Sequence, residues 1–428
     1  MKPYPAYKKS GIPWLDKIPN HWEGHPVKYH YNVQLGKMLQ NVASNPLDQA
    51  VPYLKALHVL WGEVLVSDLP EMWAGPSELL QYGVKRGDLL VCEGGEVGRA
   101  GIIKNPPKDC IIQNALHRVR AKNSESLVGY LLYLLYAVNS FEWFNILCNK
   151  ATIAHFTREK FTDLKIPVPP RPEQEKIVSL LDAKTAQIDE LIFKKEKMIE
   201  LLKEERAATI NQAVTKGLDT KVELKNSSGL SLGNIPKHWK LKKLKYLAAL
   251  KNQAAAESSS AKLCVDLENI EGWTGKIIEA GQDQKVEGAK CFLANDVLFA
   301  KLRPYLAKAF RATEPGVCGG EFLVLRPSAL INSDFLFFNL VSERFIDVVN
   351  GATYGTKMPR ASWDFIGNLR IPYPNKEEQA KIVGYLESVF KKTDSALKRL
   401  LSGVAYLKQY RAALISDVVT GKIDVRGI

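Results

Sequence analysis

The sequence has few cysteines, and none of its apolar stretches is long enough to cross a membrane. Its six cysteines are scattered over 428 residues, with no Cys-x-x-Cys pair, so neither a disulfide framework nor a zinc site is expected. The richest apolar stretch, residues 130–137, is far shorter than the roughly 20 residues of a membrane helix. Lys2, Lys8 and Lys9 precede no apolar core, so we expect no signal peptide. These features predict a soluble cytoplasmic protein with reduced thiols and no membrane partner.

The sequence also has few glycines and prolines, and only a moderate excess of positive charge. The chain holds 29 Gly and 22 Pro, with 46% hydrophobic and 25% charged residues, which is typical of a globular protein and excludes fibrous or disordered classes. The formal charge of +13 is compatible with a polyanionic partner, although basic enzymes of this size are common. No segment is a basic tail, and the excess leans toward residues 239–428.

Catalytic signatures are missing as well. Residues 105–108 read Asn-Pro-Pro-Lys, and Lys108 cannot stack an extruded base as an aromatic residue would, so a surface turn is expected. The glycine-rich stretch 93–101 lacks Gly-Lys-Ser/Thr and is interpreted as a hairpin or bulged turn displaying Arg99. His21 lies in no zinc-binding pattern and is interpreted as structural. We therefore predict no catalytic residue, no metal site and no cofactor in this chain.

The chain contains an internal repeat, which governs the prediction of its fold. The block Ile-Pro-x-His-Trp at 18–22 returns 217 positions later at 235–239, each time after a Ser-Gly pair, Ser10-Gly11 and Ser228-Gly229. A second repeat at an offset of 205 joins Ile-Pro-x-Pro and Glu-Gln-x-Lys-Ile-Val, found at 166–178 and 371–383. Its register continues through matched residues as far as Val214-Thr215 and Val419-Thr420.

Between the repeated blocks the two copies diverge, but a common scaffold remains. Short alternating stretches predict strands, and aromatic segments with helical spacing predict helices packed on a sheet. The predicted strands are 87–91 and 117–120 in the first copy and 295–299 and 323–326 in the second, and the predicted helices are 130–144 and 335–349.

The repeated segments predict two long helices. The stretches 173–214 and 378–419 contain no proline and are rich in good helix formers. Each helix of about 42 residues would be roughly 63 Å long. The second follows a heptad pattern typical of a coiled coil. Packing of the two helices predicts an interface of Ile177, Leu181, Ile188, Leu191, Met198, Leu202, Ile382, Leu386, Val389, Leu400, Leu407 and Leu414.

In the first helix, Lys and Glu interrupt the same register, and Ile192 and Ile199 on a neighbouring row partly offset them. Antiparallel pairing would relate the two copies by a pseudo-two-fold axis. Because the opening block also follows the first helix, the end of the second helix should lie near the start of the chain.

These repeats resemble the specificity (S) subunit of type I restriction-modification enzymes over essentially the whole chain. The resemblance rests on the twin Ile-Pro-x-His-Trp blocks, the twin Ile-Pro-x-Pro...Glu-Gln-x-Lys-Ile-Val blocks, and the two divergent domains between them. It implies two target recognition domains, each reading one half of a split sequence in double-stranded DNA. It also implies that the helices set the spacer and dock two methyltransferase subunits, with restriction subunits joining the full complex. S-adenosylmethionine, ATP and Mg would then belong to those partners.

The resulting fold prediction is α+β: two mixed α/β target recognition domains joined by two long antiparallel coiled-coil helices. The predicted segments are 1–21 (N-terminal), 22–165 (first recognition domain), 166–238 (central helix and linker), 239–370 (second recognition domain) and 371–428 (C-terminal helix).

Residues that read DNA place hydrogen-bonding groups at base edges or hold phosphates. The candidates lie on predicted loops and strand ends. They are Arg99, Gln113, Asn114, His117, Arg118, His155 and Arg158 in the first domain, and Lys301, Arg303, Tyr305, Arg311, Tyr354, Lys357 and Arg360 in the second. Each could instead be a solvated surface charge. Two alternatives stay open for the whole chain: a single-chain methyltransferase or nuclease, and a coiled-coil scaffold with a role independent of DNA.

Overall fold

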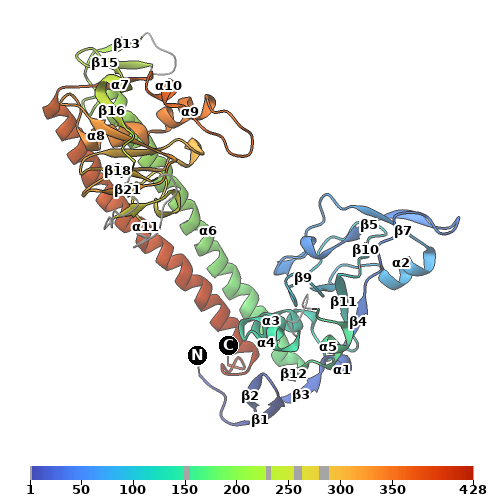
Figure 1. Cartoon of the computed structure of the whole chain (residues 1–428). Coiled ribbons are helices and arrows are strands. Elements are labelled where there is room, and N and C mark those ends of the chain that lie inside the picture. The colour runs from blue at the N-terminus through green and yellow to red at the C-terminus, as the bar shows by residue number, and fades with distance from the viewer. Residues whose placement is uncertain (1, 149–154, 228–232, 255–262, 279–288, 428) are drawn as a thin grey trace. The chain divides into compact units, whose positions relative to one another are not determined.

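The computed structural model describes residues 2–148, 155–227, 233–254, 263–278 and 289–427 (Figure 1). The chain forms two compact units, one of residues 1–195 with 402–428 and the other of residues 196–401. Each unit holds one divergent domain together with a part of both long helices. Of the repeated Ser-Gly pairs, Ser228-Gly229 lies outside the described residues.

In the first unit a mixed sheet forms the centre of the domain. Its strand order is β4-β11-β8-β9-β6, with β11 and β8 antiparallel. A smaller sheet of order β10-β5-β7 lies beyond it, and two further strand pairs, β1-β2 and β3-β12, adjoin the helices. The bounds are β1 Tyr7–Ile12, β2 Leu15–Pro19, β3 Glu23–Pro26, β4 Tyr31–Leu35, β5 Gln49–Leu54, β6 Gly62–Glu63, β7 Glu71–Ala74, β8 Leu89–Cys92, β9 Ala100–Ile102, β10 Ile111–Ile112, β11 Leu116–Ala121 and β12 Lys165–Val168.

Short helices complete the first domain. They are α1 Val27–His30, the 3-10 helix η1 Ala56–His58, α2 Pro76–Tyr82, α3 Val128–Ser140, α4 Trp143–Leu147 and α5 Arg158–Asp163. The predicted aromatic helix 130–144 is confirmed as α3 and α4, and α3 packs on β8, β9 and β11. The turn at 105–108 lies on the surface, as predicted.

The second unit repeats the central sheet with the strand order β16-β22-β19-β20. Its smaller sheet has the order β17-β21-β18, and pairs β13-β14 and β15-β23 adjoin the helices. The strands are β13 Leu224–Asn226, β14 Asn234–Pro236, β15 Lys240–Lys243, β16 Ala248–Lys251, β17 Cys264–Val265, β18 Lys290–Phe292, β19 Val297–Ala300, β20 Ala309–Arg311, β21 Gly316–Cys318, β22 Phe322–Pro327 and β23 Arg370–Tyr373. The helices are α7 Leu244–Leu247, η2 Leu267–Asn269, η3 Pro304–Leu306, α8 Ser333–Leu340, α9 Glu343–Gly351 and α10 Trp363–Ile366.

The strands β8 and β19 are the centre of each core. All four residues of each strand are buried, because one sheet face packs under helices and the other under the smaller sheet. In the second domain Phe299 belongs to the cluster that contains α8 and α9, whereas its neighbour Leu298 belongs to the cluster of the smaller sheet. A strand covered on both faces has no polar alternation, which explains the continuous apolar runs at these positions.

The two predicted long helices are confirmed as α6 Arg171–Lys216 and α11 Lys376–Val419, with 46 and 44 residues. They pack against each other within each unit (Figure 1). In the first unit Arg411 pairs with Asp189 at 2.9 Å, and in the second Arg206 pairs with Asp394 at 2.7 Å. These pairs are equivalent at the repeat offset of 205. Contacts in each unit advance along α6 as they retreat along α11, so the pairing is antiparallel, as predicted.

Two residues of the predicted helix interface are wrong. Leu191 and Met198 are 48% and 54% exposed, whereas Ile192 and Ile199 are 8% and 7% exposed. The buried stripe of α6 therefore follows the row of Ile192 and Ile199, and Thr185 is buried on it as well. The prediction is wrong at these two residues because it applied the heptad register of the second helix to the first helix. The other predicted interface residues are buried or half-buried.

The repeated motifs meet each other in space. In the first unit, Glu173 accepts hydrogen bonds from His21 Nε2 at 2.9 Å and Trp22 Nε1 at 3.1 Å. The Tyr4 hydroxyl also donates to Glu173. Burial and the Glu173 carboxylate raise the pKa of Tyr4, so it remains a donor. The structural role predicted for His21 fits this geometry.

In the second unit, Glu378 accepts hydrogen bonds from His238 Nε2 at 2.8 Å and Trp239 Nε1 at 2.9 Å. We call these two arrangements the first and second carboxylate hubs. The indole of Trp22 or Trp239 is fully buried in its unit, so the single hydrogen-bonding atom of the indole must find a partner there. The repeated His-Trp and Glu-Gln blocks thus form one structural feature.

The end of α11 lies beside the start of the chain, as predicted. The Tyr7 hydroxyl donates to Gly421 O at 3.0 Å, and Asp424 N donates to Lys2 O at 2.9 Å. Gly421 approaches Trp22, just as Gly217, after α6, approaches Trp239 in the second unit. Both glycines have a positive φ that favours glycine. Each long helix is therefore followed by a glycine that lies against the tryptophan of a hub.

Candidate nucleic-acid interface

The central strand of the first domain ends in a defined backbone frame. Glu93 follows β8, and its N–H donates to Ala115 O at 3.0 Å. Its own carbonyl accepts from Phe156 N at 2.7 Å. We call Glu93, Ala115 and Phe156 the first strand end. Three segments far apart in the sequence therefore meet at this residue.

The second domain repeats this frame. Lys301 follows β19, its N–H donates to Glu321 O at 3.0 Å, and its carbonyl accepts from Ala361 N at 2.9 Å. We call Lys301, Glu321 and Ala361 the second strand end. The frame depends only on backbone groups, so it leaves the side chains free to differ between the domains.

Two predicted loops of the second domain lie against each other at this strand end. Leu302 pairs with Arg360, and Arg303 N donates to Pro359 O at 2.8 Å. The Arg360 guanidinium donates to Glu321 Oε1 at 2.7 Å. We call residues 301–305 and 354–360 the loop cluster. It gathers six of the seven residues predicted in this domain: Lys301, Arg303, Tyr305, Tyr354, Lys357 and Arg360.

The side chains of Arg303, Tyr305, Tyr354 and Lys357 are exposed in the loop cluster. Arg303 adopts a positive φ of 49°, which is uncommon for a residue with a Cβ. A non-glycine residue held there is often part of a functional loop. Cations beside aromatic rings suit the phosphates and bases of a nucleic acid.

Arg311, the seventh predicted residue, lies elsewhere. It belongs to β20, and its Nε donates to Asp334 Oδ1 at 2.7 Å. Asp334 is in the first turn of α8. The structure therefore gives Arg311 the role of fastening a helix to the sheet, outside the loop cluster, and its DNA contact stays a prediction.

In the first domain, Gln113, Asn114 and His155 flank the first strand end. Gln113 N donates to Leu54 O and Asn114 N to Lys37 O, both at 2.9 Å. These bonds hold the turn between β10 and β11, while both side chains stay half-exposed. His155 is exposed beside Gly94. The three predicted residues are thus brought together around Glu93, which the sequence prediction omitted.

His117 lies in the core instead. It is fully buried, and its Nε2 hydrogen-bonds Phe156 O at 2.7 Å. Its Nδ1 is buried without a partner within the described residues. Burial lowers the pKa of His117 to about 4, so the ring is neutral near pH 7. The prediction that it contacts DNA is corrected, because the side chain supports the first strand end from beneath.

Arg99 also has a structural role. Its Nη2 donates to Ala56 O at 2.9 Å, and its Nη1 pairs with Glu96. At the equivalent place in the second domain Lys308 Nζ donates to Leu267 O at 2.6 Å. Both cations fasten the β-hairpin to a 3-10 helix. The predicted hairpin at 93–101 is confirmed, but Arg99 is turned inward and is not displayed as expected. Its DNA contact stays a prediction.

Arg118 and Arg158 line one pocket of the first domain. The hollow has a volume of about 380 Å³. Arg158 Nε donates to Val33 O at 2.9 Å, and Arg118 donates to Gly83 O. Burial and neighbouring Arg120 lower the pKa of Arg118. We call the hollow the basic pocket; its lining residues include Lys28, Gln34, Arg118, Arg120, Lys122 and Arg158.

Three cations of the basic pocket were not among the residues predicted from the sequence. Arg120 pairs with Asp88 and Lys28 with Asp163, whereas Lys122 donates to Lys28 O. The alternation of Arg118 and Arg120 on β11 with Lys122 directly after it was a usable signal, because alternate residues of a strand share one face. A concave surface lined by five cations suits a phosphate group.

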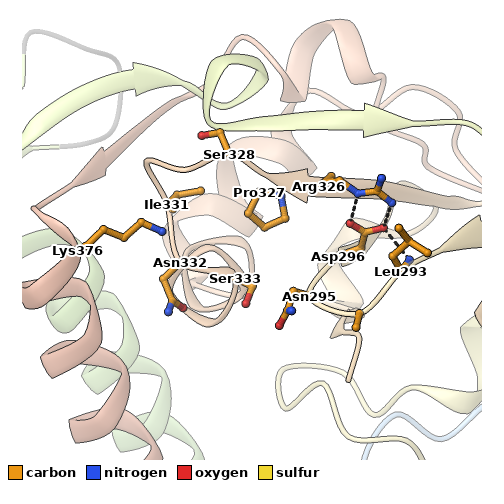
Figure 2. Close-up of a pocket in the computed structure, with 11 residues that line it drawn as sticks. Leu293, Asn295, Asp296, Arg326, Pro327, Ser328, Ile331, Asn332, Ser333 and Lys376 are labelled. Atoms are coloured by element: carbon orange, nitrogen blue, oxygen red, sulfur yellow. Dashed lines mark hydrogen bonds and ion pairs between the residues drawn. The ribbon is translucent and has the colours of Figure 1, made fainter. Parts of the chain in front are cut away.

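The second domain has a different hollow (Figure 2). Arg326 is held by Asp296 through Nε and Nη2, both at 2.8 Å, in the same way that Asp88 holds Arg120. Lys376 lines the hollow from the start of α11, and its volume is about 430 Å³. Most of the remaining lining is uncharged. The two domains therefore place their cations differently: in a pocket beside β4 in the first and in the loop cluster in the second.

The described part of the chain lacks two kinds of feature. No group of three or more His, Cys, Asp or Glu side chains there could hold a metal ion. No described helix is long and apolar enough to span a membrane.

Comparison with known proteins gives a family match. The description "Type I restriction modification DNA specificity domain" fits residues 79–201 and 236–404, which is more than half of the chain. The chain is 25% identical over 306 residues to the type I restriction enzyme EcoDI specificity subunit of Escherichia coli. That match covers 64% of this chain and 66% of the relative, slightly less than two thirds of its length.

Further relatives extend the match. The MjaVIII specificity subunit of Methanocaldococcus jannaschii is 25% identical over 360 residues, 79% of this chain and 80% of the relative. A solved chain from work on complex assembly and conformational transition of the type I R-M system has a TM-score of 0.71 at 15% identity, covering 95% of this chain and 99% of that one. The HsdS subunit from Thermoanaerobacter tengcongensis has a TM-score of 0.52 at 16% identity, covering 95% and 98%. The fold is therefore shared with these structures.

Proposed function

The chain belongs to the family of type I restriction-modification DNA specificity subunits, and on that premise we propose that each divergent domain reads one half of a bipartite DNA target. The observation that carries this proposal is the duplicated strand end. Identical backbone frames hold Glu93 in one domain and Lys301 in the other. A constant frame with different side chains is what two readers of different half-sites need.

The helices α6 and α11 are proposed to set the distance between the half-sites. An uninterrupted helix of 44 to 46 residues would extend roughly 66–69 Å. The antiparallel ion pairs fix the register of the two helices within each unit. Half-site spacing on a duplex is a geometric matter of helical turns, and a fixed helix pair would supply that geometry.

The same helices are proposed to dock two methyltransferase subunits. Apolar side chains on them point to solvent, among them Leu191 and Phe193 in the first unit and Met198 and Leu401 in the second. Apolar residues exposed in numbers on a helix surface mark a protein interaction site. Restriction subunits would join the complex through those partners.

We assign no reaction to this chain. S-adenosylmethionine, ATP and Mg would be bound by the partner subunits, and the complex would act on DNA in the cytoplasm. Binding of the isolated chain to DNA should be modest, because its positive charge is divided between separate surfaces. A steep salt dependence for the isolated chain would contradict this division.

The test is reconstitution with the cognate methyltransferase subunits. Adenine methylation is measured on random-sequence DNA for the chain alone, the partner alone and both together. We expect site-specific methylation at one bipartite sequence only when both are present. Methylation by this chain alone, or an unchanged specificity of the partner on adding it, would reject the proposal. The first outcome would favour the single-chain enzyme and the second a scaffold role.

A further inference from the structure

The two strand ends carry opposite charges at one equivalent position. Glu93 comes two residues after Val91, and Lys301 two residues after Phe299. Val91 lies opposite His117, and Phe299 lies opposite Leu323, in corresponding antiparallel pairs. Side chains two residues apart point to the same face of a strand. Glu93 and Lys301 therefore leave equivalent faces of the two sheets.

Neither charge forms an ion pair with an oppositely charged side chain among the described residues, although His155 lies close enough to Glu93 to interact with it electrostatically. Within the residues that the structure describes, no hydrogen bond or ion pair involves the Glu93 carboxylate or the Lys301 ammonium, although both are half-buried. Other charges close by in the chain are paired, as Glu96 is with Arg99 and Glu321 with Arg360. An unpaired, half-buried charge costs free energy. A ligand that pairs with it would recover that cost.

The space next to Glu93 is open. Gly94 and Gly95 follow it, and a Cβ on Gly95 would meet no atom within 4 Å. Gly95 has a φ of +74°, a conformation that favours glycine. Two residues without side chains let another molecule approach the backbone beside the carboxylate. His155 lies beside Gly94, and Asn114 directly precedes Ala115 of the first strand end. Both side chains can also hydrogen-bond.

We propose that Glu93 and Lys301 are base-reading residues of opposite polarity at matched positions of the two domains. The inference rests on the proposed function and adds to it the type of base edge that each domain reads. A carboxylate only accepts hydrogen bonds, so Glu93 would read an amino group, on cytosine N4 or adenine N6. An ammonium only donates, so Lys301 would read guanine O6 and N7.

The sign of the charge limits the roles open to Glu93. A carboxylate is repelled by phosphates, so the group that Glu93 would contact on DNA is a base edge. Lys301 could serve either group. The loop cluster also carries the exposed cations Arg303 and Lys357, which would hold the phosphates while Lys301 reaches a base.

The test uses the full chain assembled with its cognate methyltransferase subunits. Binding is measured on DNA libraries in which each base pair of the bipartite target is randomised in turn. In Glu93→Gln the amide donates as well as accepts, so discrimination between amino-bearing and carbonyl-bearing bases should fall about tenfold at one position of one half-site. Lys301→Met should lose a similar preference for guanine at one position of the other half-site.

Each variant carries its own control. The untouched half-site must keep its preference, which shows that the chain is folded and assembled. Glu63→Gln and Lys240→Met replace exposed residues of the same charge in each domain and should change nothing. Equal weakening for every base, or an unchanged preference at every position, would overturn the inference and leave the proposed function standing. A wild-type complex without a bipartite preference would instead reject the proposed function, and this inference with it.

Discussion

The two divergent domains share a backbone frame and differ in what they attach to it. At the strand end the first domain has Glu93 where the second has Lys301, and beneath it the first has His117 where the second has Leu323. The frame is built from N–H and C=O groups, which every residue except proline supplies. Its side chains can therefore change without loss of the fold. A recognition domain can vary its target by the same means.

The cations with a structural role are also equivalent in the two domains. Arg120 and Arg326 are held by equivalent aspartates, and Arg99 and Lys308 donate to equivalent carbonyls. Their charge is used inside each domain. The exposed cations differ between the domains. They are Lys28, Lys122 and Arg158 at the basic pocket of the first, and Arg303 and Lys357 in the loop cluster of the second. The comparison of the two domains thus distinguishes cations that stabilise the fold from cations that could bind a ligand.

The largest effect should come from lengthening both helices. Seven residues inserted after Lys195 in α6 and after Leu401 in α11 keep the heptad pattern and add roughly 10 Å, about three base pairs of DNA. The complex should lose binding to the original target and bind a spacer longer by about that amount, as measured by selection from random DNA. Insertion in one helix only is the control and should disrupt the pairing. An unchanged spacer after the double insertion would reject the role of the helices as a ruler.

The carboxylate hubs should differ in stability. Glu173 has three side-chain donors and is buried, whereas Glu378 has two and is partly exposed. Hydrogen bonds to a charged group are worth about 1.5–3 kcal/mol, and more is lost when buried donors are left unpaired. Glu173→Gln should lower the free energy of unfolding of its unit by about 3 kcal/mol, and Glu378→Gln by about 1–2 kcal/mol.

Amide hydrogen exchange of β12 and β23 would measure the two hub variants separately. Each substitution serves as the control for the other, because the hubs are equivalent. Equal losses would show that burial of the hub does not matter.

The first domain should be the more sensitive to acid. The pKa of His117 is about 4 in the folded chain and about 6.5 when unfolded, so the unfolded chain binds the extra proton first. The stabilisation is complete above pH 6.5 and is lost as the pH falls toward 4. At pH 5 this should cost the first domain about 2 kcal/mol relative to pH 7.5. Hydrogen exchange of β11 and β22 at both pH values would measure it.

The matched variant for this prediction is His117→Leu, which gives the first domain the residue type that the second domain has at the equivalent position, Leu323. Leucine cannot be protonated, so the part of the acid sensitivity due to this position should disappear. An identical pH dependence in the variant and the wild type would show that His117 is not its source.

The smallest effect should come from removing one cation that contacts a DNA phosphate. Arg158→Ala in the basic pocket should weaken DNA binding by the complex about equally for all sequences and reduce the slope of log affinity against log salt by about one. Lys357→Ala should do the same from the loop cluster. Arg158→Lys keeps the charge and should keep the slope. A change of base preference in either alanine variant would instead make that residue a base reader.

The sequence predicted the framework of this molecule well, and the physical reasons are local. A proline-free heptad pattern predicts a helix whatever surrounds it, and a run such as Val297–Ala300 predicts a buried strand. The register of α6 was missed at Leu191 and Met198 because a single row of residues decides it. The repeats predicted equivalent segments, but not that His21 and Trp22 would meet Glu173.

The site was harder to predict, because it depends on contacts between distant segments. Arg99 turns inward because the carbonyl of Ala56 lies there, and no periodicity in the sequence indicates it. Lys301 and Arg360 become neighbours through the backbone of Leu302 and Ala361. Glu93 was omitted since an acid is an unexpected residue at a DNA surface. Its significance emerges only from comparison with Lys301.

Exchange of the first recognition domain tests the central claim most directly. Residues 22–165 are replaced by the equivalent residues of another family member, and the target of the reconstituted complex is determined by sequencing the methylated DNA. The account predicts that one half-site changes completely, while the other half-site and the spacer remain the same. A change in both half-sites would contradict the claim that two equivalent frames read DNA independently.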